Sequence, residues 1–153
     1  MGLLSRRRPA DRVLLVDADR TPVPDPSGVL FRVVAEAVIL QDEAEAVLAA
    51  VGRHEHLGLL APRGGPLVHR FFQLRDQLPR HQLDPSTARR TAQLDTILLH
   101  HAMQVATALD FLAVEGRSER MAAHVGAIHG LGAPAQLLDG IYAELKVEAT
   151  AGP

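Results

Sequence analysis

The sequence predicts an all-α fold: a helical bundle of about five helices around a long helix over residues 85–115, with a possible short N-terminal β-strand. The segment from Asp84 to Gly116 predicts that helix, because Asp84-Pro85 supplies an N-cap and a first-turn proline and Gly116 a left-handed stop. Aromatic residues make up only 3% of the chain, so the core must be aliphatic, which suits helix packing. Prolines and glycines divide the remainder into segments with helical periodicity.

The long helix is apolar over more than one face. One stripe follows spacings of three and four residues and contains Leu94, Leu98, Ala102, Val105, Leu109 and Leu112. Much of the remaining circumference is filled by Ile97, Leu99, Met103, Ala106, Ala108 and Phe111. Such a helix needs several neighbouring helices or a second copy of itself to cover it.

The N-terminal half contains one candidate strand and one ambiguous segment. The apolar run 13–16 is short enough for a strand, and residues 21–28 hold three prolines and predict a rigid loop. Residues 29–51 predict helix with a break near Gln41-Asp42, although 29–40 is also good strand material. Gly52 is expected to end this helix.

Proline and glycine set the expected boundaries of the other helices. Residues 54–61 predict a short helical piece, closed by a turn at 62–65, and Pro66 is expected to open a separate helix that Pro79 stops. After Gly116 a helix over 118–131 is expected, which Gly130-Leu131-Gly132 breaks, and Pro134 starts the last helix. The predicted organisation is a flexible basic tail over 1–10, a single helical domain over 11–148 and a frayed tail over 149–153.

Composition excludes several kinds of function. The chain has no cysteine, which rules out disulfides, thiolate metal sites and cysteine nucleophiles. Its formal net charge is only −2, so nucleic acid is an unlikely partner, and no apolar run is long enough to span a membrane. The apolar residues at the N-terminus precede the charges, the wrong order for a secretory signal, so a cytoplasmic protein is expected.

One short motif points to phosphoryl transfer. An apolar run followed by Asp17-Ala18-Asp19-Arg20-Thr21 resembles the first motif of haloacid-dehalogenase-type phosphotransferases, and also the opening of a response-regulator receiver. The first resemblance implies Asp17 as nucleophile and Asp19 as acid/base, with Mg²⁺ between them, in a doubly wound sheet. The resemblance covers nine residues, and the helical remainder lacks the later acidic pair. The alternative without catalysis is a short edge strand, or the lead-in to a helix, that ends in solvated carboxylates.

The eight histidines do not follow a metal-binding pattern. Helical metal ligands lie three or four residues apart, and no pair of histidines here meets that spacing within a helix, so no metal site is predicted. A ligand site assembled across helices stays open, with His100, Gln104, Asp110 and His124 as its candidates. His101 has apolar neighbours one turn away on both sides, which is typical of a hydrogen-bonded core or interface histidine whose neutral form is favoured.

A polar stripe runs along the long helix: Arg89, Gln93, Thr96, His100, Gln104, Thr107 and Asp110. It is either a solvated face or a surface for a ligand or a second protein. The predicted helical hairpin over residues 94–131 resembles that of sensor kinases related to the sporulation phosphotransferase. The residues that carry the resemblance are Met103-Gln104-Val105, Leu109, Leu112, Gly116-Arg117 and Glu119. The resemblance implies a dimerising hairpin, but Ile97 stands where that family carries its phosphorylated histidine.

These observations favour a non-enzymatic interaction or regulatory module that forms a homodimer and binds a protein partner not identifiable from sequence. The expected dimer seam lies on the long helix and consists of Leu98, His101, Val105, Leu109 and Leu112. The first alternative is a small-molecule or metal sensor with a pocket between the long helix and the C-terminal helices. The weaker alternative is a phosphotransferase that uses Asp17 and Asp19. No cofactor is indicated.

Overall fold

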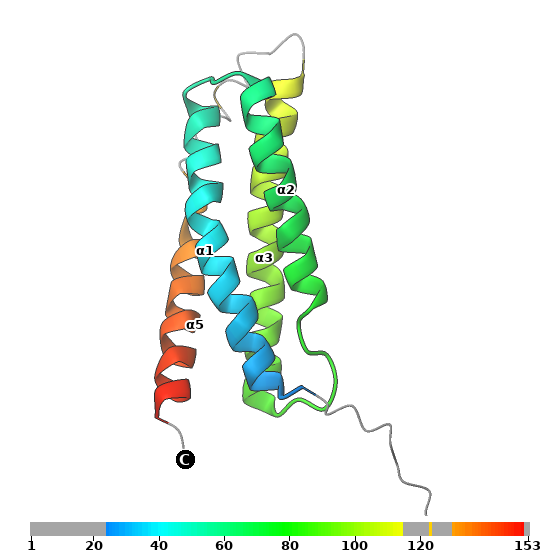
Figure 1. The fold of residues 1–153 in the computed structure, drawn as a ribbon, viewed down its shortest axis with the longest axis vertical. Helices are drawn as coiled ribbons and strands as arrows, with labels where there is room; N and C mark the ends of the chain where they lie inside the picture. Colours follow the sequence, from blue (N-terminus) through cyan, green and yellow to red (C-terminus); the bar gives the residue numbers. More distant parts are fainter. Residues whose placement is uncertain (1–23, 115–122, 124–129, 152–153) are drawn as a thin grey trace, which may run out of the picture.

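The computed structural model describes residues 24–114, 123 and 130–151 (Figure 1). These residues contain four named α-helices: α1 (Pro26–Gly52), α2 (Leu57–Asp76), α3 (Pro85–Ala113) and α5 (Ala133–Thr150). The all-α prediction is confirmed for this part of the chain, which holds no β-strand. The tail 1–10, the expected strand 13–16 and almost all of the expected helix 118–131 lie outside the described residues.

The four helices alternate in direction along the chain (Figure 1). Helices α1 and α3 contact each other, and each of them also contacts both α2 and α5. Within the described ranges α2 and α5 do not touch, so they flank the central α1–α3 pair on opposite sides. The core is aliphatic, as expected, and its largest side chains with full burial include Phe71, Leu30, Leu48, Leu74, Leu94, Leu98 and Leu138.

Helix α1 is continuous, so the predicted break near Gln41-Asp42 is wrong, and 29–40 is helix rather than strand. Asp25 caps its N-terminus by accepting hydrogen bonds from the backbone N–H groups of Ser27 and Gly28. Its buried residues recur every three or four positions along one side and include Leu30, Val33, Val34, Ala37, Gln41, Ala44, Val47, Leu48 and Val51. Gln41 belongs to this buried face, which explains why a polar residue there does not interrupt the helix.

Helix α2 is also continuous, although the sequence predicts two helices separated by a turn at 62–65. Pro62 and Pro66 lie inside the helix, despite the backbone hydrogen bonds that each proline removes. The buried residues on both sides of the expected turn share one face: Leu60, Gly64, Leu67, Phe71 and Leu74. Burial of this face along α1 and α3 offsets the local preference of proline and glycine to break the helix.

Gly64 allows close contact between α2 and α3. A Cβ atom at Gly64 would lie 2.8 Å from Cδ1 of Leu109, whereas a Cβ at Gly65 meets nothing within 4 Å. Alanine is favoured over glycine in a helix by about 1 kcal/mol. We therefore expect Gly65→Ala to raise the free energy of unfolding by about 1 kcal/mol, and Gly64→Ala to lose at least that gain to the displacement of Leu109.

Urea denaturation of the two variants measures this difference. In a Leu109→Ala background the methyl group at position 64 has space, so the two glycine substitutions should have the same effect. Equal gains in the free energy of unfolding from Gly64→Ala and Gly65→Ala in the chain that keeps Leu109 would contradict the close contact.

Helices α3 and α5 begin as predicted. Asp84 caps α3, which extends to Ala113 rather than residue 115, and the expected stop at Gly116 lies outside the described residues. The predicted break before the last helix is confirmed, because Gly130 and Gly132 have positive φ angles of 105° and 68° and Pro134 lies in the first turn of α5. Among the described helices none has the length and apolarity needed to cross a membrane.

Candidate functional site

Helix α3 carries most of the predicted site residues, and its N-terminus is firmly capped. Asp84 accepts hydrogen bonds from the backbone N–H groups of Ser86 and Thr87 and from the Thr87 hydroxyl. The Thr87 hydroxyl, followed by the Thr87 backbone N–H, holds the pKa of Asp84 below its usual value. The helix then contacts α1, α2 and α5, which leaves one longitudinal face open.

The predicted dimer seam is inside the bundle rather than on its surface. Leu98, His101 and Val105 are fully buried, and Leu112 is 7% exposed. Leu109 is half-buried and lies against Gly64 of α2. A seam between two copies needs accessible side chains, so these residues are not available for it while the chain keeps this fold. The apolar stripe was correctly placed on one face of the helix, but other helices of the same chain cover it.

A buried polar chain connects the three helices α3, α1 and α5. His101 Nε2 lies 2.9 Å from Gln41 Oε1, and Gln41 Nε2 donates to Asp139 Oδ1 at 3.2 Å. Because the amide nitrogen of Gln41 is directed to the exposed carboxylate of Asp139, the amide oxygen of Gln41 is left to accept a hydrogen bond from His101. The hydrogen-bond network therefore assigns the proton of the neutral imidazole to Nε2.

Burial strongly favours the neutral form of His101. The pKa of His101 is lowered to about 4, mainly by burial of the ring and secondarily by the neighbouring His100. The rings of His101 and Phe71 pack in a T-shaped arrangement with their centroids 5.4 Å apart. The Nδ1 atom of His101 is buried without a hydrogen-bond partner. His101 is therefore a hydrogen-bonded histidine in the core, one of the two settings that its apolar sequence neighbours predict.

The predicted ligand residues that the structure describes do not converge. His100 and Gln104 lie one turn apart and half-buried, but Asp110 is exposed and ten residues from His100, about 15 Å along the helix axis. His124 lies outside the described residues, as do Asp17 and Asp19 of the phosphotransferase resemblance. In the described ranges no group of three or more histidine, aspartate or glutamate side chains could hold a metal ion.

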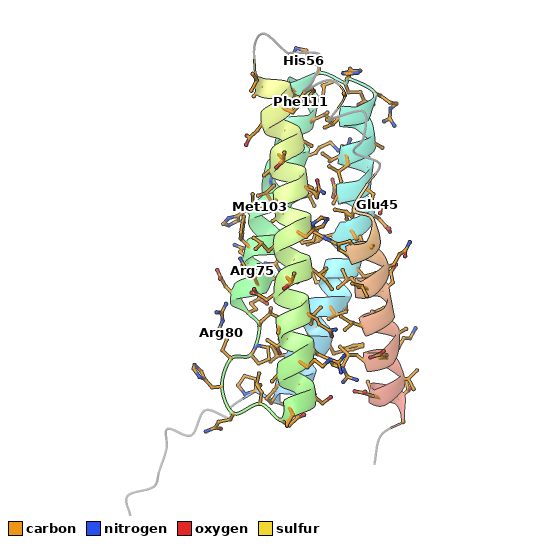
Figure 2. All side chains as sticks on the ribbon, turned by 180° about the vertical axis from the view of Figure 1, so that it is seen from behind. Glu45, His56, Arg75, Arg80, Met103 and Phe111 are labelled. Carbon is orange, nitrogen blue, oxygen red and sulfur yellow. The ribbon has the colours of Figure 1, made fainter. Side chains whose placement is uncertain are left out.

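The polar stripe of α3 lies on its open face. Arg89, Gln93, Thr96, Thr107 and Asp110 are exposed, and His100 and Gln104 are half-buried. Met103 interrupts the stripe and is 51% exposed, and Figure 2, which looks onto α3, shows it on the outside of the bundle. Sequence reasoning grouped Met103 with the apolar circumference. Met103 lies seven residues after Thr96 and four before Thr107. This helical spacing indicates that Met103 is on the same exposed side of the helix as these two residues.

Ion pairs connect neighbouring helices of the described bundle. Arg75 of α2 forms a bidentate pair with Asp95 of α3 at 3.0 and 2.8 Å. Arg70 of α2 pairs with Glu36 of α1, and Arg90 of α3 pairs with Glu148 of α5 at 2.8 Å. In contrast, Arg89 and Asp110, at the two ends of the polar stripe, make no hydrogen bond or ion pair in the described structure. The open face of α3 therefore ends in one free positive and one free negative charge.

Comparison with protein-family models, curated proteins and solved structures finds no match to this chain. The function is therefore inferred from the residues and their geometry.

Proposed function

We propose that this chain is a non-enzymatic, cytoplasmic interaction module that forms a homodimer through the open face of α3. The observation that supports this is a second set of residues on α3, spaced alternately four and three apart and outside the core. We call this set the outer seam, and it consists of Pro85, Arg89, Ala92, Thr96, Leu99, Met103, Ala106 and Asp110. This spacing is the heptad pattern by which two helices interlock.

The middle of the outer seam has the composition expected of a contact between helices. Leu99 and Met103 supply apolar side chains that interlock with a facing helix. Ala92 lies two turns before Leu99 and Ala106 one turn after Met103, and their small side chains let a second helix approach closely. Exposed methionine suits an interaction surface because its flexible thioether adapts to the partner.

The other functional hypotheses have less support. A metal or small-molecule sensor needs converging donor groups, and the candidates on α3 are spread along the helix. The sensor pocket was expected between the long helix and the C-terminal helices. Of these the structure describes α5, which the polar chain from His101 through Gln41 of α1 to Asp139 connects with α3. The phosphotransferase hypothesis depends on Asp17 and Asp19 and stays a prediction.

Native mass spectrometry of the untagged full chain tests the proposal. We expect twice the chain mass at micromolar concentration and no additional mass from a bound species. We expect Met103→Asp to shift the protein to monomer without loss of helicity, because Met103 is already 51% exposed in the folded chain. An excess mass that is lost on denaturation would instead support the sensor hypothesis.

Leu137→Asp on α5 is the matched control, since Leu137 is 59% exposed and lies away from the outer seam. This variant should remain dimeric. A monomeric wild-type chain over the whole concentration range, or a dimer insensitive to Met103→Asp, would contradict the proposal.

A further inference from the structure

The two free charges of α3 are placed symmetrically about the middle of its open face. Arg89 lies eleven residues before His100 and Asp110 ten residues after it, so they are about 16 and 15 Å from His100 along the helix axis. Both side chains are exposed, and neither has a partner in the described structure. A second copy of α3 that runs in the opposite direction brings each charge opposite its counterpart.

We propose that the two copies pack antiparallel along the outer seam, about a two-fold axis near His100, so that Arg89 of each chain pairs with the partner's Asp110. The orientation deepens the proposed homodimer and rests on it. A two-fold interface uses the same surface patch of both copies, so one set of complementary charges on α3 forms two equivalent ion pairs.

The opposite orientation is unfavourable. In a parallel dimer Arg89 would face the partner's Arg89 and Asp110 the partner's Asp110, which places like charges at both ends of the seam. Between these ends the exposed stripe residues Gln93, Thr96 and Thr107 carry no charge, so nothing there opposes either direction. The charges at the ends therefore decide the orientation.

The position of Asp110 within its own helix supports a partner for it. Asp110 lies in the last turn of α3, where the negative end of the helix dipole makes an acidic side chain unfavourable. An antiparallel partner places a guanidinium group next to this carboxylate. The apolar contacts agree, because in this register Leu99 lies at the axis and meets Leu99 of the other copy, and Met103 packs beside Thr96 of the other copy.

Charge reversal tests the pairing. Sedimentation equilibrium at low salt should show that Arg89→Asp and Asp110→Arg each raise the dimer dissociation constant by about tenfold or more, because each changes two pairs per dimer from attraction to repulsion. The variant that carries both substitutions restores opposite charges and should return to within about threefold of the wild-type constant. Added salt should reduce the effects of the single substitutions.

The results separate this proposal from the proposed function. Single substitutions without effect, or a double variant that stays as weak as the single ones, overturn the antiparallel pairing and leave the homodimer in place. A wild-type chain that never dimerises overturns both.

Engineered cysteines give the orientation directly, because the chain has none of its own. Under mild oxidation His100→Cys lies next to the axis and should form a disulfide between the two copies. Thr107→Cys should not, because in an antiparallel dimer its two copies are about 21 Å apart along the axis, beyond the reach of a disulfide. Efficient cross-linking at position 107 contradicts the antiparallel orientation, and failure at position 100 contradicts the location of the axis.

Discussion

Replacing Phe71 by alanine should lower the free energy of unfolding by about 3–5 kcal/mol, the range typical for loss of a buried aromatic side chain. Phe71 is fully buried on α2 and its ring meets the imidazole of His101. The truncation leaves a cavity between α2 and α3 and removes the aromatic contact with His101. In a chain of this size such a loss is a large fraction of the total stability.

The adjacent residue provides the control. Phe72 is 36% exposed, so Phe72→Ala makes the same chemical change outside the core and should cost less than about 1 kcal/mol. Guanidinium chloride denaturation followed by circular dichroism measures both variants. If the two alanine variants were equally stable, the assignment of the buried face of α2 would be wrong.

The stability of the folded chain should decrease by about 2 kcal/mol between pH 7 and pH 5 because of His101 alone. The pKa of His101 is lowered from its ordinary value of 6.5 to about 4 in the folded chain. Between these values the unfolded state binds a proton that the folded state does not, so stability falls as the pH falls through 6.5 towards 4. Above pH 6.5 the contribution of His101 is fully present.

His101→Gln removes the titrating ring and keeps an amide nitrogen that donates to Gln41. We expect this variant to be less stable at pH 7 but to lose about 2 kcal/mol less than the wild type on going to pH 5. The comparison is made at and above pH 5 because the pKa of Asp84, Asp95 and Glu148 is lowered by hydrogen bonds from Thr87, Arg75 and Arg90, so their effects on stability come at lower pH. Identical pH slopes for the two proteins would contradict a buried neutral His101.

Local signals in the sequence were sufficient for the start of α3 and the break before α5. The Asp84-Pro85 cap and the glycines at 130 and 132 act through their immediate neighbours, so no tertiary information was needed. The same kind of signal failed for α2. Pro62 and Pro66 predict a turn locally, but contacts with α1 and α3 maintain a continuous helix.

The site could be predicted only in part. Periodicity identified the apolar face of α3 that contains Leu98 and Val105, but it does not tell whether the same chain or a second copy covers that face. Gln41 as the partner of His101 was not predicted, since sixty residues separate them in the sequence. The polar stripe was predicted, and its significance as the open face of α3 became apparent only once the positions of α2 and α5 were known.

The arrangement of α2 and α5 on opposite sides of the bundle has a consequence for slow motions. Because α2 and α5 do not touch in the described structure, α5 can open without disturbing the contacts between α2 and α3. Such an opening separates Asp139 from Gln41 and so releases the amide that fixes the imidazole of His101. Solvent protons then reach this ring by a local fluctuation of one peripheral helix, and we expect amide hydrogen exchange to show that α5 opens separately from α2 and α3.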